Sequence, residues 1–250
     1  MPLRVGFDLD GTVADMYSAL HREALTLFGE EALRKAAYKT SQPQEIKGEQ
    51  SGKKPETTPK AEDDQATTDV MQELHLTARQ QMQLWDHVKK IENFWSTLPE
   101  LEPGIIARIA KTATERRWEV IFLTTRPSTA GELVQMQSQR WLDAHGFQYP
   151  SVYVVQRSRG KIADALALDA FVDDRPENCL DIAVESKAKV ILVWHGNLVD
   201  VPAGAKRLGI QPVTTISEAM ALLERLDDVR SKPGFMRSLK RALGGESSDI

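Results

Sequence analysis

The feature that most constrains the fold is a series of short apolar segments that alternate with helical segments after Gly104. Each apolar segment is a continuous run and not an alternation of apolar and polar residues. Continuous runs are typical of parallel strands, because helices cover both faces of such a sheet. Strands are predicted at residues 3–7, 119–123, 151–155, 170–172 and 189–194. The sequence therefore predicts an α/β fold with a doubly wound, Rossmann-like parallel sheet.

The segments between these strands have apolar residues three or four positions apart, which indicates helices. Helices are predicted at residues 16–28, 77–95, 105–116, 128–145, 161–166, 177–186 and 217–226. Only one strand precedes residue 16, and the alternation of helices and strands begins after Gly104. Residues 16–98 are thus predicted to be a helical insertion after the first strand. The core domain would comprise residues 1–15 and 99–229, followed by a basic tail at 230–250.

Within the insertion, residues 40–68 have an unusual composition. The 29 residues include no aromatic side chain and three prolines, and their only apolar side chains are Ile46, Ala61 and Ala66. Such a segment buries too little apolar surface to offset the entropy lost on ordering. We expect it to be a flexible, low-complexity part of the insertion.

Charge and cysteine content exclude several classes of protein. The 250 residues carry 32 basic and 36 acidic side chains, and this net charge of −4 gives no overall basic face for a nucleic-acid partner. Cys179 is the only cysteine, which excludes an intramolecular disulfide and a cysteine-based zinc cluster. The sequence has neither a signal-peptide pattern at its start nor a membrane-spanning apolar segment. We expect a cytoplasmic protein with no membrane or nucleic-acid partner, which could form a homodimer.

Acidic residues follow the first predicted strand. Asp8 and Asp10 are two positions apart, so an extended backbone directs both carboxylates to the same side. Gly11 then allows a sharp turn in which the backbone can approach an anion closely. Ligands of open parallel sheets bind at the carboxyl ends of the strands. Asp8 and Asp10 are therefore candidate site residues.

Other polar residues follow the later strands and would lie at the same edge of the sheet. Thr124 and Thr125 follow the second strand, Lys161 lies past the third, and Asp173 and Asp174 close the fourth. Carboxylates from two strands would make an all-oxygen site suited to Mg²⁺. Hydroxyls and a lysine opposite that site could stabilise the charge of a phosphoryl group. Each feature alone is typical of an ordinary turn or strand end, and it is their joint occurrence that indicates chemistry.

This ordered set of residues resembles the four motifs of the haloacid dehalogenase (HAD) superfamily of phosphotransferases. Residues 8–13, Asp-Leu-Asp-Gly-Thr-Val, match the first motif, and Thr124, Lys161 and the Asp173-Asp174 pair match the other three. Asp15, the tandem threonines 124–125 and residues 172–178 are similar to the 5′(3′)-deoxyribonucleotidases within that superfamily. In such proteins an insertion at this place is a C1-type cap. The resemblance implies a Mg²⁺-dependent phosphatase acting on a small phosphorylated substrate, most simply a nucleoside monophosphate.

The resemblance also implies roles for individual residues. Asp8 would be the nucleophile, Asp10 the acid and base, and Thr124 and Lys161 would bind the phosphoryl group. Substrate or phosphate binding is expected from Gly11, Thr12, Thr125 and Arg126, and metal binding from Asp8, Asp10, Asp173 and Asp174. Asp10 would bind the metal through its backbone carbonyl, and Asp174 could instead orient Lys161 or a metal-bound water.

The sequence leaves two alternatives open. The same residues would serve a phosphatase for sugar phosphates or other small phosphomonoesters, because the cap selects the substrate. The chain could also be a catalytically silent binding module with the same fold, although such a module has no need of all the motif residues.

Overall fold

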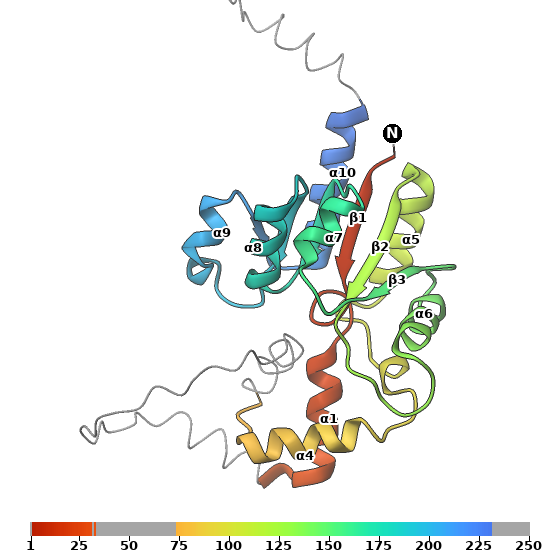
Figure 1. Cartoon of the computed structure of the whole chain (residues 1–250), viewed down its shortest axis with the longest axis vertical. Helices are drawn as coiled ribbons and strands as arrows, with labels where there is room; N and C mark the ends of the chain where they lie inside the picture. Colours follow the sequence, from red (N-terminus) through yellow and green to blue (C-terminus); the bar gives the residue numbers. More distant parts are fainter. Residues whose placement is uncertain (1, 32, 34–73, 232–250) are drawn as a thin grey trace, which may run out of the picture.

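The computed structural model describes residues 2–31, 33 and 74–231, and the low-complexity segment at 40–68 lies outside them, as does the tail beyond Ser231. In the described residues six parallel strands form one sheet with the order β3-β2-β1-β4-β5-β6 (Figure 1). The strands are β1 (Arg4–Asp8), β2 (Glu119–Thr124), β3 (Ser151–Val154), β4 (Ala170–Asp173), β5 (Lys189–Val193) and β6 (Gln211–Val213). The predicted doubly wound α/β fold is confirmed.

The order of the strands determines where a ligand can bind. The chain fills the sheet from β1 outward in one direction and then, from β4, in the other. The point where the order reverses therefore lies between β1 and β4, where Phe7 pairs with Val172. Crevices of doubly wound sheets open at the carboxyl ends of the strands at such a point. The residues that follow β1 and β4 thus stand at the expected binding crevice.

Strand β6 is an element that the sequence did not predict. It is three residues long, lies at the edge of the sheet and contains Pro212. A proline cannot donate a hydrogen bond to a neighbouring strand, and within sheets it is confined mainly to edges. Because its apolar content is also low, β6 has none of the signals that identify the buried strands.

The helices differ from prediction mainly at their ends. They are α1 (Met16–Phe28), α4 (Ala78–Val88), α5 (Ile105–Arg116), α6 (Val134–Ala144), α7 (Arg159–Ala165), α8 (Pro176–Glu185), α9 (Ala203–Arg207) and α10 (Ile216–Ser231). Two short 3-10 helices are η1 (Phe94–Ser96) and η2 (Leu198–Asp200). Helices α1 and α5 have the predicted bounds, whereas α9 was not predicted.

Two predicted helices are shorter because their ends bond to each other. The helix predicted at 77–95 ends at Val88, and the helix predicted at 128–145 begins only at Val134. Between them, the Ala130 N–H donates to the Lys89 carbonyl and the Asn93 N–H donates to the Ala130 carbonyl, both at 2.8 Å. Asn93 also has a left-handed backbone with φ of 55°. The apolar spacing continues through this region, but tertiary hydrogen bonds replace the helical ones.

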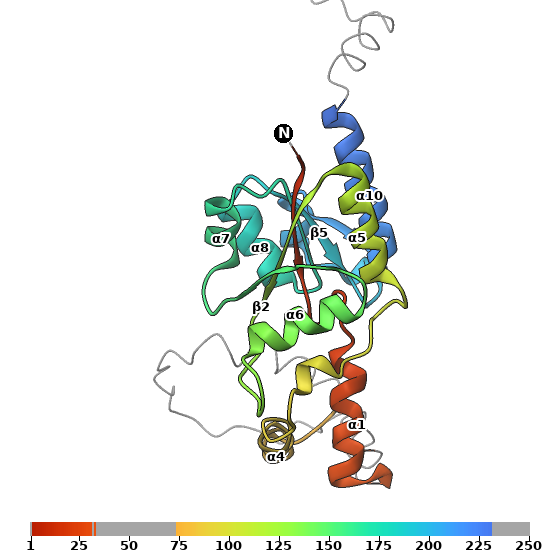
Figure 2. The same ribbon diagram turned by 90° about the vertical axis from the view of Figure 1, so that its right-hand side faces the viewer.

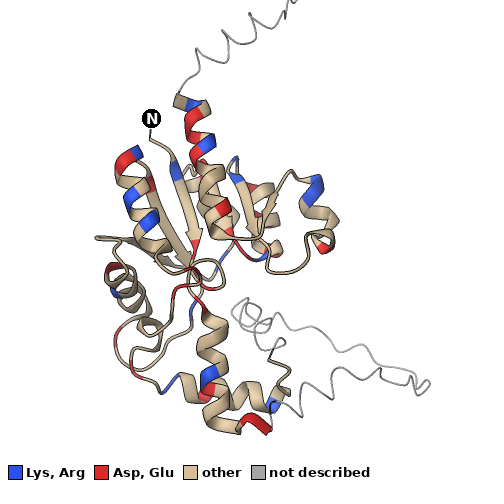
Figure 3. Cartoon of the chain, turned by 180° about the vertical axis from the view of Figure 1, so that it is seen from behind, with Lys and Arg blue, Asp and Glu red and all other residues tan. Residues whose placement is uncertain are grey.

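Helices cover both faces of the sheet (Figure 2). One face carries α5 and α10 and buries a large cluster that includes Phe7, Phe122 and Val193. The other carries α7, α8 and α9 over a smaller cluster that includes Phe171 and Leu192. Basic and acidic residues are interspersed along α5 and α10 (Figure 3). Between these two helices, Arg116 on α5 pairs with Asp227 on α10 at 3.2 Å.

The two core segments that flank the insertion are bonded to each other. The Asp15 N–H donates to the Pro99 carbonyl at 2.9 Å, and the Leu101 N–H donates to the Val13 carbonyl at 2.9 Å. Asp15 also caps α1, since its carboxylate accepts from the Ser18 N–H at 2.9 Å. The insertion therefore leaves and re-enters the core beside the loop that follows β1. Among the described residues, no helix combines the length and the apolar character needed to cross a membrane.

Candidate active site

Three carboxylates converge at the carboxyl ends of β1 and β4. Asp8 ends β1, Asp173 ends β4, and Asp174 follows directly. Each offers one oxygen atom, and these three atoms lie within 4.8 Å of one another. The Asp8 and Asp173 side chains are almost fully buried. The structure thus brings together three of the four residues that the sequence indicated for a metal site.

The loop after β1 approaches Asp174 closely. Gly11 has a φ of 81°, and a Cβ added there would lie 2.2 Å from Asp174 Oδ2. Both observations require glycine, since L side chains rarely adopt this backbone and would have no space. The neighbouring Thr12 hydroxyl donates to Asp174 Oδ1 at 2.9 Å. Gly11 and Thr12 therefore hold Asp174, the acidic residue of the fourth strand end, against the loop of the first.

Arg159 is the cation of this cluster. Its Nη1 donates to Asp8 Oδ1 at 2.6 Å and to Asp173 Oδ2 at 2.5 Å, and its side chain is 6% exposed. Helix α7 is fixed on α8 at Gly160, where an added Cβ would lie 2.4 Å from the Asp181 carbonyl oxygen. The Gly160 N–H also donates to the Asp181 carboxylate at 2.8 Å. This close packing aims Arg159, the first residue of α7, into the cluster.

Lys161, which the sequence indicated for this position, lies elsewhere. It is exposed, and its backbone N–H forms the first capping bond of α7 with Ser158. Positions two apart on a helix are about 200° apart around its axis, so Arg159 and Lys161 face opposite ways. The structure therefore assigns the buried cation to Arg159. A signal was present in the sequence, because glycine at 160 indicates close helix packing next to residue 159.

Asp173 accepts hydrogen bonds from two further donors besides Arg159. Its Oδ1 accepts from the Arg175 N–H at 2.9 Å, and Asn178 Nδ2 lies 3.2 Å from both carboxylate oxygens. Asn178 is on the first turn of α8, where its side-chain amide can donate to the Asp173 carboxylate. These bonds fix the orientation of the Asp173 carboxylate.

Negative charge exceeds positive charge in this cluster. Burial raises the pKa of Asp8 to about 7; Arg159 opposes that rise, and the charges of Asp173 and Asp10 add to it. Burial, together with the charges of Asp173 and Asp8, also raises the pKa of Asp174. Burial disfavours the Arg159 cation, but Asp8 and Asp173 outweigh it, so the pKa of Arg159 is raised. One guanidinium therefore does not compensate three carboxylates.

A divalent cation fits this arrangement. The three carboxylate oxygens converge, and the surplus negative charge is what a bound cation would neutralise. Hard cations such as Mg²⁺ prefer a few carboxylates with remaining positions left to water and phosphate oxygens. Asp8, Asp173 and Asp174 are the residues that could hold it.

The Asp10 side chain is not part of the cluster of Asp8, Asp173 and Asp174, and it contacts Arg126 and Thr124 instead. Its carboxylate accepts a two-pronged ion pair from Arg126, with Nε 2.8 Å from Oδ2 and Nη2 2.7 Å from Oδ1. The Thr124 hydroxyl donates to Asp10 Oδ2 at 3.3 Å. Arg126 and Thr124 were expected to bind phosphate, but the structure places both against Asp10, with their side chains buried.

A cavity of about 760 Å³ opens at the carboxyl ends of the strands, and both Asp10 and Arg126 line it. Asp8, Asp10, Asp174 and Arg159 form one part of its wall, and Thr125 and Gly11 lie beside them. The other wall includes aromatic side chains, which are Tyr17, Trp95, Trp194 and His195. Its volume is in the range of sites for small organic ligands. Of the tandem threonines, Thr125 is thus the one that faces the cavity.

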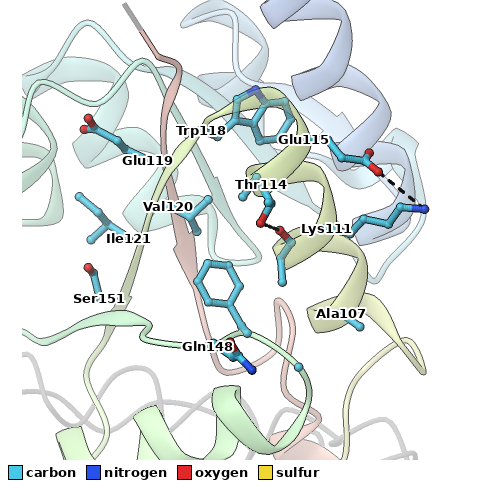
Figure 4. Close-up of a pocket in the computed structure, with 14 residues that line it drawn as sticks. Ala107, Lys111, Thr114, Glu115, Trp118, Glu119, Val120, Ile121, Gln148 and Ser151 are labelled. Atoms are coloured by element: carbon cyan, nitrogen blue, oxygen red, sulfur yellow. Dashed lines mark hydrogen bonds and ion pairs between the residues drawn. The ribbon is translucent and has the colours of Figure 1, made fainter.

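A second cavity, of about 880 Å³, lies at the opposite end of the sheet (Figure 4). It opens between α5 and the start of β2, next to Trp118 and Glu119. Its lysine, Lys111, pairs with Glu115 one helical turn away at 3.9 Å. The carboxylate cluster has no counterpart there, and the cavity of the strand carboxyl ends is the candidate active site.

Comparisons with known proteins bear on the fold. No protein-family model and no curated protein sequence matches this chain. Among solved structures, a HAD family hydrolase from Deinococcus radiodurans, which holds phosphate and sodium, is 14% identical; the match covers 90% of this chain and 96% of that one, with a TM-score of 0.51. The chain has the fold of the HAD-like hydrolases.

Two other HAD-like structures are also similar. A putative β-phosphoglucomutase from Thermotoga maritima is 17% identical over 89% of this chain and 99% of that one, with a TM-score of 0.48. A HAD-like family hydrolase from Xanthomonas campestris is 15% identical over 92% of this chain and 98% of that one, with a TM-score of 0.47.

Proposed function

We propose that this protein is a metal-dependent phosphomonoester hydrolase that acts through an aspartyl-phosphate. The observation that carries the proposal is the convergence of Asp8, Asp173 and Asp174 around Arg159, with Asp10 in the wall of the same cavity. Two carboxylates in different surroundings can divide a reaction between nucleophile and acid–base roles. Asp8 is paired with Arg159, whereas Asp10 is paired with Arg126.

In the first step, a carboxylate oxygen of Asp8 attacks phosphorus and the bond from phosphorus to the ester oxygen breaks. Asp10 donates a proton to the departing oxygen, so that an alcohol leaves and the phosphoryl group stays on Asp8. Arg159 contacts the nucleophile and is placed to balance charge on the transferred group. Thr125 lies in the cavity wall, where its hydroxyl could donate to a phosphoryl oxygen.

In the second step, Asp10 accepts a proton from a water molecule as that water attacks the phosphorus of the aspartyl-phosphate. The bond from phosphorus to Asp8 breaks, and inorganic phosphate and the free carboxylate result. A bound divalent cation would supply electrophilic stabilisation of the phosphoryl oxygens. Arg159 keeps a positive charge next to Asp8 throughout, because its pKa is raised.

A nucleoside monophosphate is the substrate class that we propose. The cavity has the size for such a molecule, and its wall combines the charged group with aromatic rings. Tyr17 is 40% exposed and stacks on His21 at 6.0 Å, so a flat aromatic surface is available to a base. Because α1 and η1 supply Tyr17 and Trp95 to this wall, we propose that the insertion acts as a cap that selects the substrate.

The test is phosphate release from a panel of ribonucleoside and deoxyribonucleoside monophosphates and sugar phosphates, with Mg²⁺ and with EDTA. Asp8→Asn serves as the inactive variant. Asp143→Asn, which removes an exposed carboxylate on α6, is the matched control. We expect turnover that needs Mg²⁺, disappears in Asp8→Asn and persists in Asp143→Asn, with nucleotides ranking first.

Other outcomes would change the proposal in specific ways. A preference for sugar phosphates would retain the chemistry and refute the substrate class. Folded, Mg²⁺-saturated protein that releases no phosphate from any ester would refute the hydrolase and favour a binding module.

A further inference from the structure

Arg126 lines the active-site cavity, but its guanidinium is bonded to other residues of the protein. Its side chain is fully buried. Its Nε and Nη2 both face the Asp10 carboxylate, at 2.8 and 2.7 Å from separate oxygens. Its Nη1 donates to the Ser138 hydroxyl on α6 at 2.9 Å. All three nitrogens of the guanidinium are therefore bonded within the protein.

The two hydrogen bonds from Arg126 fix the orientation of the Asp10 carboxylate as well as its distance from the guanidinium. An arginine that bonds both oxygens of a carboxylate sets the plane of that carboxylate as well as its position. Thr124 adds a third donor to Asp10, on Oδ2. The Asp10 side chain keeps 14% of its surface exposed, and Asp10 lines the active-site cavity. The Asp10 carboxylate is thus fixed by Arg126 and Thr124, and part of its surface faces the cavity.

The insertion contributes to the position of Arg126. The guanidinium carbon lies 5.0 Å from the centre of the Trp95 ring, within the range of a cation–π contact. Trp95 is itself fixed, because its indole N–H donates to the Pro127 carbonyl at 2.9 Å and its backbone N–H donates to Gln137 at 3.1 Å. Trp95 also packs against Trp85 of α4, with ring centres 6.4 Å apart.

We propose that Arg126 is a positioning residue that orients Asp10 for proton transfer, and that Trp95 and Ser138 hold Arg126 in place. The proposal rests on the proposed function, in which Asp10 protonates the leaving alcohol and later accepts a proton from water. Arg126 does not contact the substrate. It acts through Asp10, and the contact with Trp95 joins this acid–base group to the insertion.

The inference predicts a dependence on the leaving group. A nitrophenolate leaves without a proton, whereas an alkoxide needs one, so a misplaced Asp10 should slow the two classes of ester unequally. The experiment measures kcat/KM for p-nitrophenyl phosphate and for the best alkyl phosphate of the substrate panel. For Arg126→Gln we expect a loss of at least about 100-fold on the alkyl ester and less than about tenfold on the nitrophenyl ester.

A second readout follows from the other role of Asp10. If water attack is slowed while transfer from the nitrophenyl ester continues, Arg126→Gln should release a burst of nitrophenol before steady turnover. Asp10→Asn is the reference, which should give the same unequal losses and the same burst. Arg126→Lys keeps a positive charge without the fork, and should regain only part of the alkyl-ester activity.

Leu223→Ala is the control for general destabilisation, since it empties a buried position on α10. It should leave the ratio of the two kcat/KM values unchanged. Equal losses on both esters in Arg126→Gln, accompanied by weaker inhibition by inorganic phosphate, would overturn the inference and show that Arg126 binds the phosphoryl group.

A double-mutant cycle of Arg126 and Asp10, measured by thermal unfolding, separates this inference from the proposed function. If the native protein hydrolyses neither ester, the proposed function fails, and the contact of Arg126 with Asp10 is judged by stability alone. We expect Arg126→Gln to lower the Tm of the native protein at least twice as much as it lowers that of the Asp10→Asn variant. Equal Tm losses in the two backgrounds would mean that Arg126 does not hold Asp10, and would overturn the inference.

Discussion

The ionised carboxylate of Asp8, the proposed nucleophile, should reduce the stability of the metal-free protein. The Asp8 side chain is 4% exposed, and its pKa is raised from 3.8 to about 7, first by burial. A carboxyl whose pKa is raised on folding contributes stability below the pKa of the unfolded chain, and this contribution is lost as the pH rises through the folded value. A shift of roughly three pKa units corresponds to roughly 4 kcal/mol.

Asp8→Asn removes this ionisation while its amide oxygen can still accept a hydrogen bond from Arg159. In EDTA at about pH 8.5 the variant should therefore be more stable than the native protein by roughly 4 kcal/mol. At about pH 5.5, where the native Asp8 is mostly protonated when folded, the difference should fall to roughly 2 kcal/mol. The variant should gain stability and lose phosphate release together.

Urea unfolding in EDTA, followed by circular dichroism at both pH values, measures the two differences. Asp143→Asn controls for the loss of one negative charge, and should change stability by less than about 0.5 kcal/mol. A raised pKa of Asp8 would be contradicted if Asp8→Asn were no more stable than the native protein at about pH 8.5, or if its gain in stability did not shrink towards about pH 5.5.

Other predictions concern the surroundings of the cluster. Arg159→Met should lower kcat/KM for phosphate release by at least about 100-fold, whereas Lys161→Met should change it less than about threefold; the reverse order would restore Lys161 to the site. Gly11→Ala should lower the Tm by several degrees, because its Cβ would meet Asp174 at a positive φ, and an unchanged Tm would contradict the close approach. The Cys179 thiol, whose pKa burial raises, should react with a disulfide reagent only in urea, and rapid reaction of the folded protein would contradict its burial.

Much of the fold could be predicted because buried parallel strands have a strong sequence signal. Continuous apolar runs end in Asp8 and Asp173, so the topology of the sheet alone brings those two acids together. Strand β6 could not be found in this way, since a three-residue edge strand with Pro212 lacks a continuous run. The ends of α4 and α6 depend on hydrogen bonds between segments about 40 residues apart, which periodicity does not reveal.

The site was harder to predict than the fold where rotation about a helix decides which side chain points inward. Lys161 and Arg159 are two residues apart, and an error of a few residues in the start of α7 is enough to exchange them. The role of Arg126 could not be predicted without knowing its contacts. The sequence Thr-Thr-Arg is the same whether the arginine binds a phosphate or pairs with Asp10, as it does here. The local sequence pattern was thus sufficient to predict the positions of Asp8 and Asp173. The positions of Arg159 and Arg126 depend on tertiary packing.

Asp8 should carry the phosphoryl group during turnover. The most direct test is an acid quench of the protein with Mg²⁺ and the best substrate of the panel, followed by mass spectrometry of the peptide that contains Asp8. That peptide should carry the added mass of one phosphoryl group, which should be absent from Asp8→Asn and enriched in Asp10→Asn with p-nitrophenyl phosphate. Steady phosphate release by the native protein, with no phosphoryl group on Asp8 in any of these samples, would contradict this role of Asp8.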